Sequence, residues 1–299
     1  MAAKIPLPVR AGVAPSYLWL QKGHWNTLLE FLRERFPDVP AQIWQRRLDA
    51  GEVVDDHGNP YTCSSVYRWG GRIFYYRELE AETTIPFAEL ILFQDEHLLV
   101  VDKPHFLPVT PSGRFLQQTL LARLKNQTGL SDLSPVHRLD RETAGVMLFS
   151  INTTTRGTYQ SLFQQRAVHK QYEALAPDLS SYESPFIYRS KMVEGTPFFR
   201  MQEIVGTANS ETRIELLQQI DACTSRYRLE PLTGRKHQLR VHMAALGIPI
   251  LNDDFYPQAL PCKADDFSRP LQLLARSIAF TDPITGQERC FSSQRQLML

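Results

Sequence analysis

The chain has 299 residues, 43% of them hydrophobic, and a formal net charge of +1 at pH 7. That length predicts one large domain or two unequal ones, since domains commonly have about 100–150 residues. No apolar run approaches the roughly 18 residues that span a membrane, and the amino terminus has no secretory apolar segment, so we expect a cytoplasmic protein with no membrane partner. The four cysteines are widely spaced, which argues against a disulfide framework or a structural zinc site.

The first quarter of the chain predicts a separate amino-terminal module, residues 1–83. It contains all four tryptophans, an apolar pattern of helical spacing at residues 25–36, and a second such pattern at residues 39–50. Short strands are expected at residues 52–54 and 72–76. The two expected helices carry Arg33, Arg35, Arg46 and Arg47. These arginines predict either solvated helix faces or a small RNA-docking surface.

The remaining residues, 84–299, alternate strand and helix patterns. We expect strands at 91–93, 98–101, 146–149, 172–176 and 226–229, and helices at 115–125, 152–166 and 235–246. Neither G-x-G-x-x-G nor G-x-x-x-x-G-K-[ST] occurs, so we expect no nucleotide cofactor. His237 and His242 are not spaced as two metal ligands on one helix face, and no metal site is expected. The acidic pairs 253–254 and 265–266 are interpreted as solvated turns.

Two segments concentrate basic residues in this nearly neutral chain. Residues 135–172 carry five Lys or Arg against Asp140 and Glu142, and residues 226–242 carry five against one acidic residue. If the fold brings the two segments together, they form a basic groove that suits a phosphate backbone; solvated helix faces are the alternative. A turn at Gly234 is expected to direct the first amide groups of the next helix toward the same place, which would suit an anion.

Asp140 is the candidate catalytic group. It lies between Arg138 and Arg141 in a loop that precedes the expected strand 146–149. Positive charge on both sides favours the ionised carboxylate, which can act as a nucleophile or a base. Structural aspartates held in ion pairs are commoner, so the residue pattern by itself leaves both interpretations open.

Four ordered motifs between residues 89 and 242 bear on this choice. They are His137-Arg138-Leu139-Asp140 followed by Thr143-Ala144-Gly145, the strand pair at 89–104 with Lys103-Pro104, Lys170-Gln171-Tyr172-Glu173-Ala174-Leu175, and the block Leu232-Thr233-Gly234-Arg235-Lys236-His237-Gln238-Leu239-Arg240-Val241-His242. They resemble the H-R-L-D-x-x-T-S-G, K-P, K-x-Y-x-A-L and L-T-G-R-x-H-Q-[IL]-R-V-H motifs of the RluA-type pseudouridine synthases. Because four motifs agree in the same order, the probability of a chance match is very small.

The resemblance implies an α+β fold with a mixed, largely antiparallel central sheet flanked by helices, preceded by a small α/β module loosely similar to an S4 RNA-binding domain. It implies isomerisation of uridines in a stem-loop of ribosomal or transfer RNA, by a monomer without a cofactor, a metal or a protein partner. By position, Asp140 is the catalytic aspartate, Arg240 its partner, Tyr172 the ring that packs on the target base, and Arg138 the side chain that opens the RNA stack. The other residues expected to bind RNA are Arg141, Arg166, Lys170, Arg235, Lys236 and His237.

Two positions depart from the family pattern. Ala144 replaces the usual serine of T-S-G, and Leu274 stands where the family usually has the histidine of L-H-A, which puts one RNA contact in question. Whether Asp140 attacks the sugar, attacks the base or accepts a sugar proton stays open. Two other functions are considered. A non-catalytic RNA-binding or chaperone protein would keep the fold, and a carboxylate-dependent hydrolase would need a second catalytic carboxylate that the sequence does not offer. The RNA and the uridine are not specified by the sequence.

Overall fold

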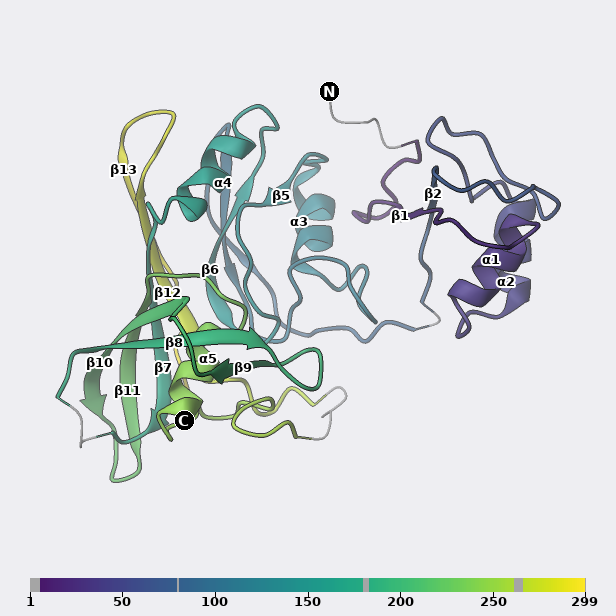
Figure 1. Ribbon diagram of the computed structural model, residues 1–299. Helices are drawn as coiled ribbons and strands as arrows, with labels where there is room; N and C mark the ends of the chain where they lie inside the picture. Colours follow the sequence, from purple (N-terminus) through teal and green to yellow (C-terminus); the bar gives the residue numbers. More distant parts are fainter. Residues whose placement is uncertain (1–5, 80, 180–182, 261–265, 299) are drawn as a thin grey trace. The chain divides into compact units, whose positions relative to one another are not determined.

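The computed structural model describes residues 6–79, 81–179, 183–260 and 266–298, which form two compact units (Figure 1). The smaller unit takes its described residues from Met1–Glu82, Pro111–Gln117 and Ala122–Ser131, and the larger from Thr83–Thr110, Gln118–Leu121 and Asp132–Leu299. The chain therefore returns to the smaller unit after residue 110. In the described ranges, no helix is both long and apolar enough to cross a membrane.

Two helices and a strand pair build most of the smaller unit: α1 (Leu28–Arg35), α2 (Ala41–Asp49), β1 (Ser16–Trp19) and β2 (Arg72–Tyr75), with β1 and β2 antiparallel. Thr27 caps α1, since its hydroxyl accepts a hydrogen bond from the amide of Glu30. The apolar side of each helix is buried in a core that includes Phe31, Leu32 and Trp44. The expected helix pair is thus present, each helix slightly shorter than its apolar pattern.

Three expectations about local structure are wrong. Residues 52–54 form no strand, because Val54 makes only isolated bridges. Arg47 is buried over the Trp44 ring and paired with Glu78, so it is not part of an exposed docking face. The helix expected from residue 115 is α3 (Leu120–Thr128), which begins five residues later.

The described strands of the larger unit form one sheet: β3 (Leu90–Gln94), β4 (Leu98–Lys103), β5 (Ser134–Pro135), β6 (Ala144–Ser150), β7 (His169–Pro177), β8 (Phe186–Glu194), β9 (Met201–Ile204), β10 (Ser210–Gln219), β11 (Thr224–Pro231), β12 (Leu273–Thr281) and β13 (Glu288–Ser292). Their order is β3-β4-β6-β12-β7-β11-β10-β8-β9, with β5 beside β6 and β13 beside β12. β6 and β12 are parallel, and every other pair is antiparallel. This mixed, mostly antiparallel sheet confirms the expected α+β class.

Burial along the strands explains their sequences. Strands β4 and β6 lie inside the sheet and are buried at every position, which is why residues 98–101 and 146–149 are continuous apolar runs. Strand β11 alternates, with Tyr227 and Leu229 buried and Arg226 and Arg228 partly exposed, because one of its faces is open to solvent. Helix α5 (Gln238–Ala245) packs on strands β8 to β11. Helix α4 (Arg156–Gln164) contributes Tyr159 to the core over β4 and β6.

The sheet order brings the chemical motifs together. The loop that contains Asp140 leads into β6, Tyr172 lies in β7, and β12 is the single strand between them. β7 also pairs with β11, whose end leads to α5 and Arg240. Three segments separated in sequence by more than 30 residues therefore meet beside the central strands of the sheet.

Candidate active site

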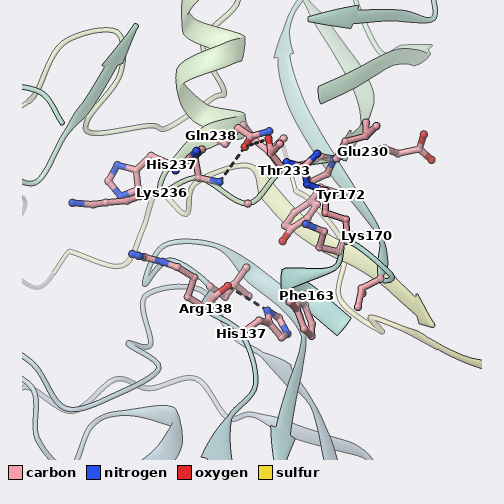
Figure 2. A pocket seen from close by; sticks show the side chains of 18 of the residues that line it. His137, Arg138, Phe163, Lys170, Tyr172, Glu230, Thr233, Lys236, His237 and Gln238 are labelled. Atoms are coloured by element: carbon pink, nitrogen blue, oxygen red, sulfur yellow. Dashed lines mark hydrogen bonds between the residues drawn. The ribbon is translucent and has the colours of Figure 1, made fainter. Parts of the chain in front are cut away.

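A cleft of about 1050 Å³ opens in the larger unit, where these three segments meet (Figure 2). Its walls come from the loop before β6, from the end of α4 through the start of β7, and from the residues between β11 and α5. Among the described residues that line it, seven are Lys or Arg and two are Asp or Glu. The cleft is thus strongly basic, although the chain as a whole is nearly neutral.

Asp140 lies on the wall of this cleft, with 18% of its side chain exposed. Its Oδ2 is 3.5 Å from NH1 of Arg240 and 3.7 Å from Nε2 of His237. Both distances exceed a hydrogen bond and place two nitrogen atoms in electrostatic contact with the same oxygen. No residue of the described chain forms an ion pair or hydrogen bond with Oδ1. The two carboxylate oxygens therefore differ: Oδ2 faces two side-chain nitrogens, and Oδ1 faces none among the described residues.

Arg240 is held mainly by Asp253. Its Nε donates to Oδ2 of Asp253 at 2.7 Å and its NH2 donates to Oδ1 at 2.6 Å, with both side chains at most 2% exposed. Burial by itself lowers the pKa of Arg240, but the hydrogen bonds and charge of Asp253 outweigh that effect and raise it. The guanidinium carbon also lies 4.8 Å from the centre of the Phe255 ring. Arg240 is consequently a fixed, permanent charge beside Asp140.

Asp253 was expected to be part of a solvated turn, and that interpretation is wrong. Besides Arg240, its Oδ1 accepts hydrogen bonds from the amides of Phe255 and Tyr256 at 2.8 and 3.1 Å. These local bonds are typical of an aspartate in a turn, so the sequence correctly predicted the turn but not its burial. What the sequence did not reveal is that the turn packs on α5. The other acidic pair lies partly outside the described residues, at position 265.

Tyr172 and Lys170 project from β7 into the cleft, across from Lys236 and His237 (Figure 2). Burial and the nearby charge of Asp140 raise the pKa of Tyr172, so its hydroxyl stays protonated at neutral pH. The ring is thus a flat, neutral surface next to the carboxylate. Burial, together with the charge of Arg166, lowers the pKa of Lys170.

The structure brings together most of the residues expected to bind RNA. The cleft is lined by Arg138, Arg166, Lys170, Arg235, Lys236 and His237. Arg141 does not line it, because its side chain turns to Glu142, with Nε 2.6 Å from Oε1. The expected basic groove is therefore present without Arg141.

Two side chains, the buried Lys103 and the partly buried His137, hold the loop that contains Asp140. Lys103 donates three hydrogen bonds of 2.9 Å, to the carbonyl groups of Pro104, Leu107 and Arg141, and its burial lowers its pKa to about 7. Nε2 of His137 accepts the amide of Leu148 at 3.1 Å, which ties the loop to β6. Burial lowers the pKa of His137 to about 4, so its ring is neutral. Both residues belong to the motifs, but their structural roles were not expected.

The turn at Gly234 is not the start of a helix, contrary to expectation. Helix α5 begins at Gln238, and His237 precedes it with a left-handed φ of 55°. The amide of Arg235 donates to Oε1 of Gln238 at 3.1 Å, as does the hydroxyl of Thr233 at 2.7 Å (Figure 2). The amide group nearest the turn is thus already used by the protein, and the proposed anion site of helix-start amides is not formed there.

Two further features concern ligands. Leu274, in place of the family's histidine, is fully buried against Ala144 and Leu175. In the ranges that the structure describes, no group of three His, Cys, Asp or Glu side chains has the arrangement of a metal site.

Comparison with known proteins identifies the family. A family model described as RNA pseudouridylate synthase matches residues 97–245. The dual-specificity RNA pseudouridine synthase RluA of Haemophilus influenzae is 33% identical over 210 residues, which are 68% of this chain and 92% of that protein. RluA of Vibrio vulnificus is 36% identical over 208 residues, 67% of this chain and 80% of that protein. The solved structure of human RNA pseudouridylate synthase domain containing 4 matches with a TM-score of 0.54 and 27% identity, covering 70% of this chain and 88% of that one.

The motifs, the sheet and the matched relatives agree. The chain therefore belongs to the RNA pseudouridylate synthase family and is an enzyme that isomerises uridine in RNA to pseudouridine.

Proposed function

We propose that Asp140 is the catalytic carboxylate and that its Oδ1 is the oxygen presented to the target uridine. One observation carries this assignment. Arg240 and His237 both face Oδ2, at 3.5 and 3.7 Å, whereas Oδ1 has no ion-pair or hydrogen-bond partner in the described part of the chain. A carboxylate with one oxygen held near a fixed cation and the other open to a cleft can act on a bound nucleoside without first breaking a protein contact.

The chemistry of the reaction fits this arrangement. Isomerisation breaks the bond between N1 of uracil and C1′ of ribose, rotates the base and joins C5 to C1′; the C5 proton is lost and N1 gains one. Electrons and atoms balance within the nucleoside, so the reaction needs no external oxidant or reductant. What it needs is a carboxylate, an enclosed site and a surface that holds the free base in place. The chain's own Asp140, cleft and Tyr172 supply these three elements in our proposal.

Tyr172 and Arg138 are assigned complementary roles. The ring of Tyr172 lies on β7 within the cleft and is positioned to pack against the flat face of the uracil. Arg138 is exposed at the cleft, two residues before Asp140. Its guanidinium can occupy the place that the base leaves when it turns out of the RNA stack.

The substrate is proposed to be a structured loop of ribosomal or transfer RNA, bound by a cytoplasmic monomer. The cleft offers four cationic side chains at its walls for the phosphate backbone: Arg166, Lys170, Arg235 and Lys236. Residues 84–299 contain every residue assigned to chemistry. Residues 1–83 are proposed to add RNA contacts, with the exposed Arg33, Arg35 and Arg46 as candidates.

A tritium-release assay tests the assignment of Asp140, because the C5 proton of uridine is lost once for each isomerisation. With RNA that contains uridine tritiated at C5, Asp140→Asn should release no tritium above background in a single-turnover reaction while its RNA affinity stays within about twofold. Glu142→Gln is the matched control, since it removes a carboxylate two residues away that does not line the cleft. Turnover by Asp140→Asn at the wild-type rate would refute the assignment.

A further inference from the structure

A series of hydrogen-bonding groups leads from strand β9 to Asp140. The amide of Met201, the first residue of β9, donates to the hydroxyl of Tyr256 at 2.8 Å. That hydroxyl lies 2.9 Å from Nδ1 of His237, whose Nε2 is 3.7 Å from Oδ2 of Asp140. Within the described chain, neither Met201 nor Tyr256 lines the cleft. The series therefore connects the cleft to residues that do not line it.

The directions of these bonds determine where the proton of His237 lies. A backbone amide can only donate, so the oxygen of Tyr256 accepts from Met201. The hydroxyl proton of Tyr256 has no acceptor other than Nδ1 of His237 among the described residues. A neutral imidazole that accepts at Nδ1 carries its own proton at Nε2, the nitrogen that faces Asp140.

Burial keeps the ring of His237 neutral, lowering its pKa to about 4. The charge of Asp140 acts in the opposite direction, and so, more weakly, does Asp253; the charges of Arg240 and Lys236 reinforce the effect of burial. At neutral pH the ring thus has one proton, and its position depends on Tyr256.

We propose that Tyr256 is a positioning residue that fixes His237 as a neutral Nε2–H donor directed at Oδ2 of Asp140. The inference rests on the proposed role of Asp140. With the proton at Nε2, the ring stabilises negative charge on the carboxylate alongside Arg240. With the proton at Nδ1, the lone pair of Nε2 would face the carboxylate and repel it. One hydroxyl group outside the cleft therefore decides whether this neighbour favours or opposes the charged form of Asp140.

The surroundings of Tyr256 make its hydroxyl a clean target for substitution. The ring is 4% exposed, and the guanidinium carbons of Arg200 and Arg240 lie 5.0 and 5.4 Å from its centre. Its backbone amide donates to Asp253. These contacts remain when the hydroxyl is removed, so Tyr256→Phe preserves the packing of the ring while Nδ1 of His237 and the amide of Met201 both lose their partner.

Single-turnover kinetics test the proposal first. Tyr256→Phe should lower the rate of tritium release by about 10- to 100-fold, as loss of an outer partner of a functional histidine does at metal sites. Its RNA affinity should stay within about twofold. Tyr227→Phe is the matched control, because Tyr227 is also buried and its hydroxyl donates to the carbonyl of Pro177, away from the series. Equal rates for wild type, Tyr256→Phe and Tyr227→Phe would overturn the proposal.

Nitrogen NMR on protein labelled at histidine measures the tautomer of His237, which would not change if Tyr256 served only in packing. The signals of His237, assigned by their loss in His237→Gln, should show the proton at Nε2 in the wild type and a mixture of tautomers in Tyr256→Phe. His237→Gln, which keeps an N–H donor near the position of Nε2, should retain more activity than His237→Phe. A wild-type proton at Nδ1 overturns the proposal even if a variant misfolds.

The same measurements separate this inference from the proposed function. If Asp140→Asn is inactive while Tyr256→Phe keeps the Nε2 tautomer and the wild-type rate, only the role of Tyr256 is refuted. If Asp140→Asn is active, the assignment of Asp140 fails, whatever the tautomer of His237.

Discussion

Arg240 and Asp253 form a two-point ion pair, with hydrogen bonds of 2.7 and 2.6 Å between planar groups that are almost completely buried. Asp140 lies farther from the same guanidinium, 3.5 Å from NH1. The arginine is therefore anchored by one carboxylate and directed at another. This division keeps the Arg240 charge in place even when Asp140 changes its contacts during a reaction.

Asp253→Asn should destabilise the protein strongly. A neutral amide cannot balance the buried charge of Arg240, and removing one partner of a buried ion pair costs about 3–5 kcal/mol of unfolding free energy. Urea denaturation measures this loss, and Asp132→Asn, an exposed carboxylate of the same unit, should change little. A loss of less than about 1 kcal/mol in Asp253→Asn would show that the pair is not held as described.

The activity that remains after substitution of Arg240 should depend on the shape of the new side chain as well as its charge. Arg240→Met leaves Asp253 as an unpaired buried carboxylate, so tritium release should be severely impaired. Arg240→Lys should recover only part of the rate, because an ammonium group cannot donate in parallel to both oxygens of Asp253. The measurement is single-turnover release with saturating enzyme. Full activity of Arg240→Lys would mean that charge alone suffices.

RNA binding should weaken steeply as salt concentration rises, because the cleft is lined by cations. Removing one phosphate contact, as in Lys236→Ala, should reduce the slope of log affinity against log salt by about 0.7–0.9. Arg141→Ala serves as the control, since Arg141 lies outside the cleft beside Glu142. The basic-cleft model fails if affinity is independent of salt, or if Arg141→Ala changes the slope and Lys236→Ala does not.

Stability should fall as pH decreases from about 6.5 to about 4. Burial lowers the pKa of His105, His137, His237 and His242 to about 4. In this pH range the unfolded chain binds protons at these residues and the folded chain does not, so protonation favours unfolding. Each histidine lowers the unfolding free energy by up to about 1.4 kcal/mol for each pH unit of acidification in this range.

His242→Gln tests this pH dependence at one site. His242 is fully buried and hydrogen-bonded to Thr212 and Ser210. Its removal should reduce the slope of unfolding free energy against pH below about 6.5 by the amount that one titrating histidine contributes. The exposed His24, replaced by Gln, provides the comparison. Identical slopes for wild type and His242→Gln, measured by urea denaturation at several pH values, would contradict the prediction.

Leu274→His would restore the residue usual in the family, yet we expect it to be harmful here. Leu274 is 0% exposed in an apolar cluster with Ala144, Leu175 and Leu297. An imidazole buried there without a hydrogen-bond partner should cost about 1–3 kcal/mol. Thermal unfolding measures the cost, with Leu274→Met as the volume-matched control. A more active and equally stable Leu274→His would show that the position accepts a polar contact.

Local patterns were sufficient for some of these elements and not for others. The runs at 98–101 and 146–149 predicted strands because a strand buried on both faces must be apolar throughout. The expected helix at 115–125 began too early, because Phe115 and Leu116 are apolar for a different reason: they are buried outside α3. The spacing of apolar residues reports burial, and burial by itself does not distinguish a helical turn from a packed loop.

The candidate site shows the same division. The basic residues of the cleft could be predicted as a group, since their charge is a property of sequence. Arg141 could not be separated from Arg138 by residue type, because only the side-chain directions in the folded loop show that Arg141 turns to Glu142. Asp253 and Tyr256 lie in no motif used for the prediction, and their roles follow from packing against α5.

The sequence by itself determined the family and the α+β class, and it identified Asp140, Arg240 and Tyr172 as the candidates for chemistry. These depend on residue identity, order and local periodicity, which the chain carries whatever its conformation. The tertiary structure decided which carboxylate holds Arg240, which oxygen of Asp140 faces no other described residue, and which groups face the two ring nitrogens of His237. Those are distances and directions between segments far apart in sequence. They are fixed only when strands β6, β12, β7 and β11 take their order and α5 packs against them.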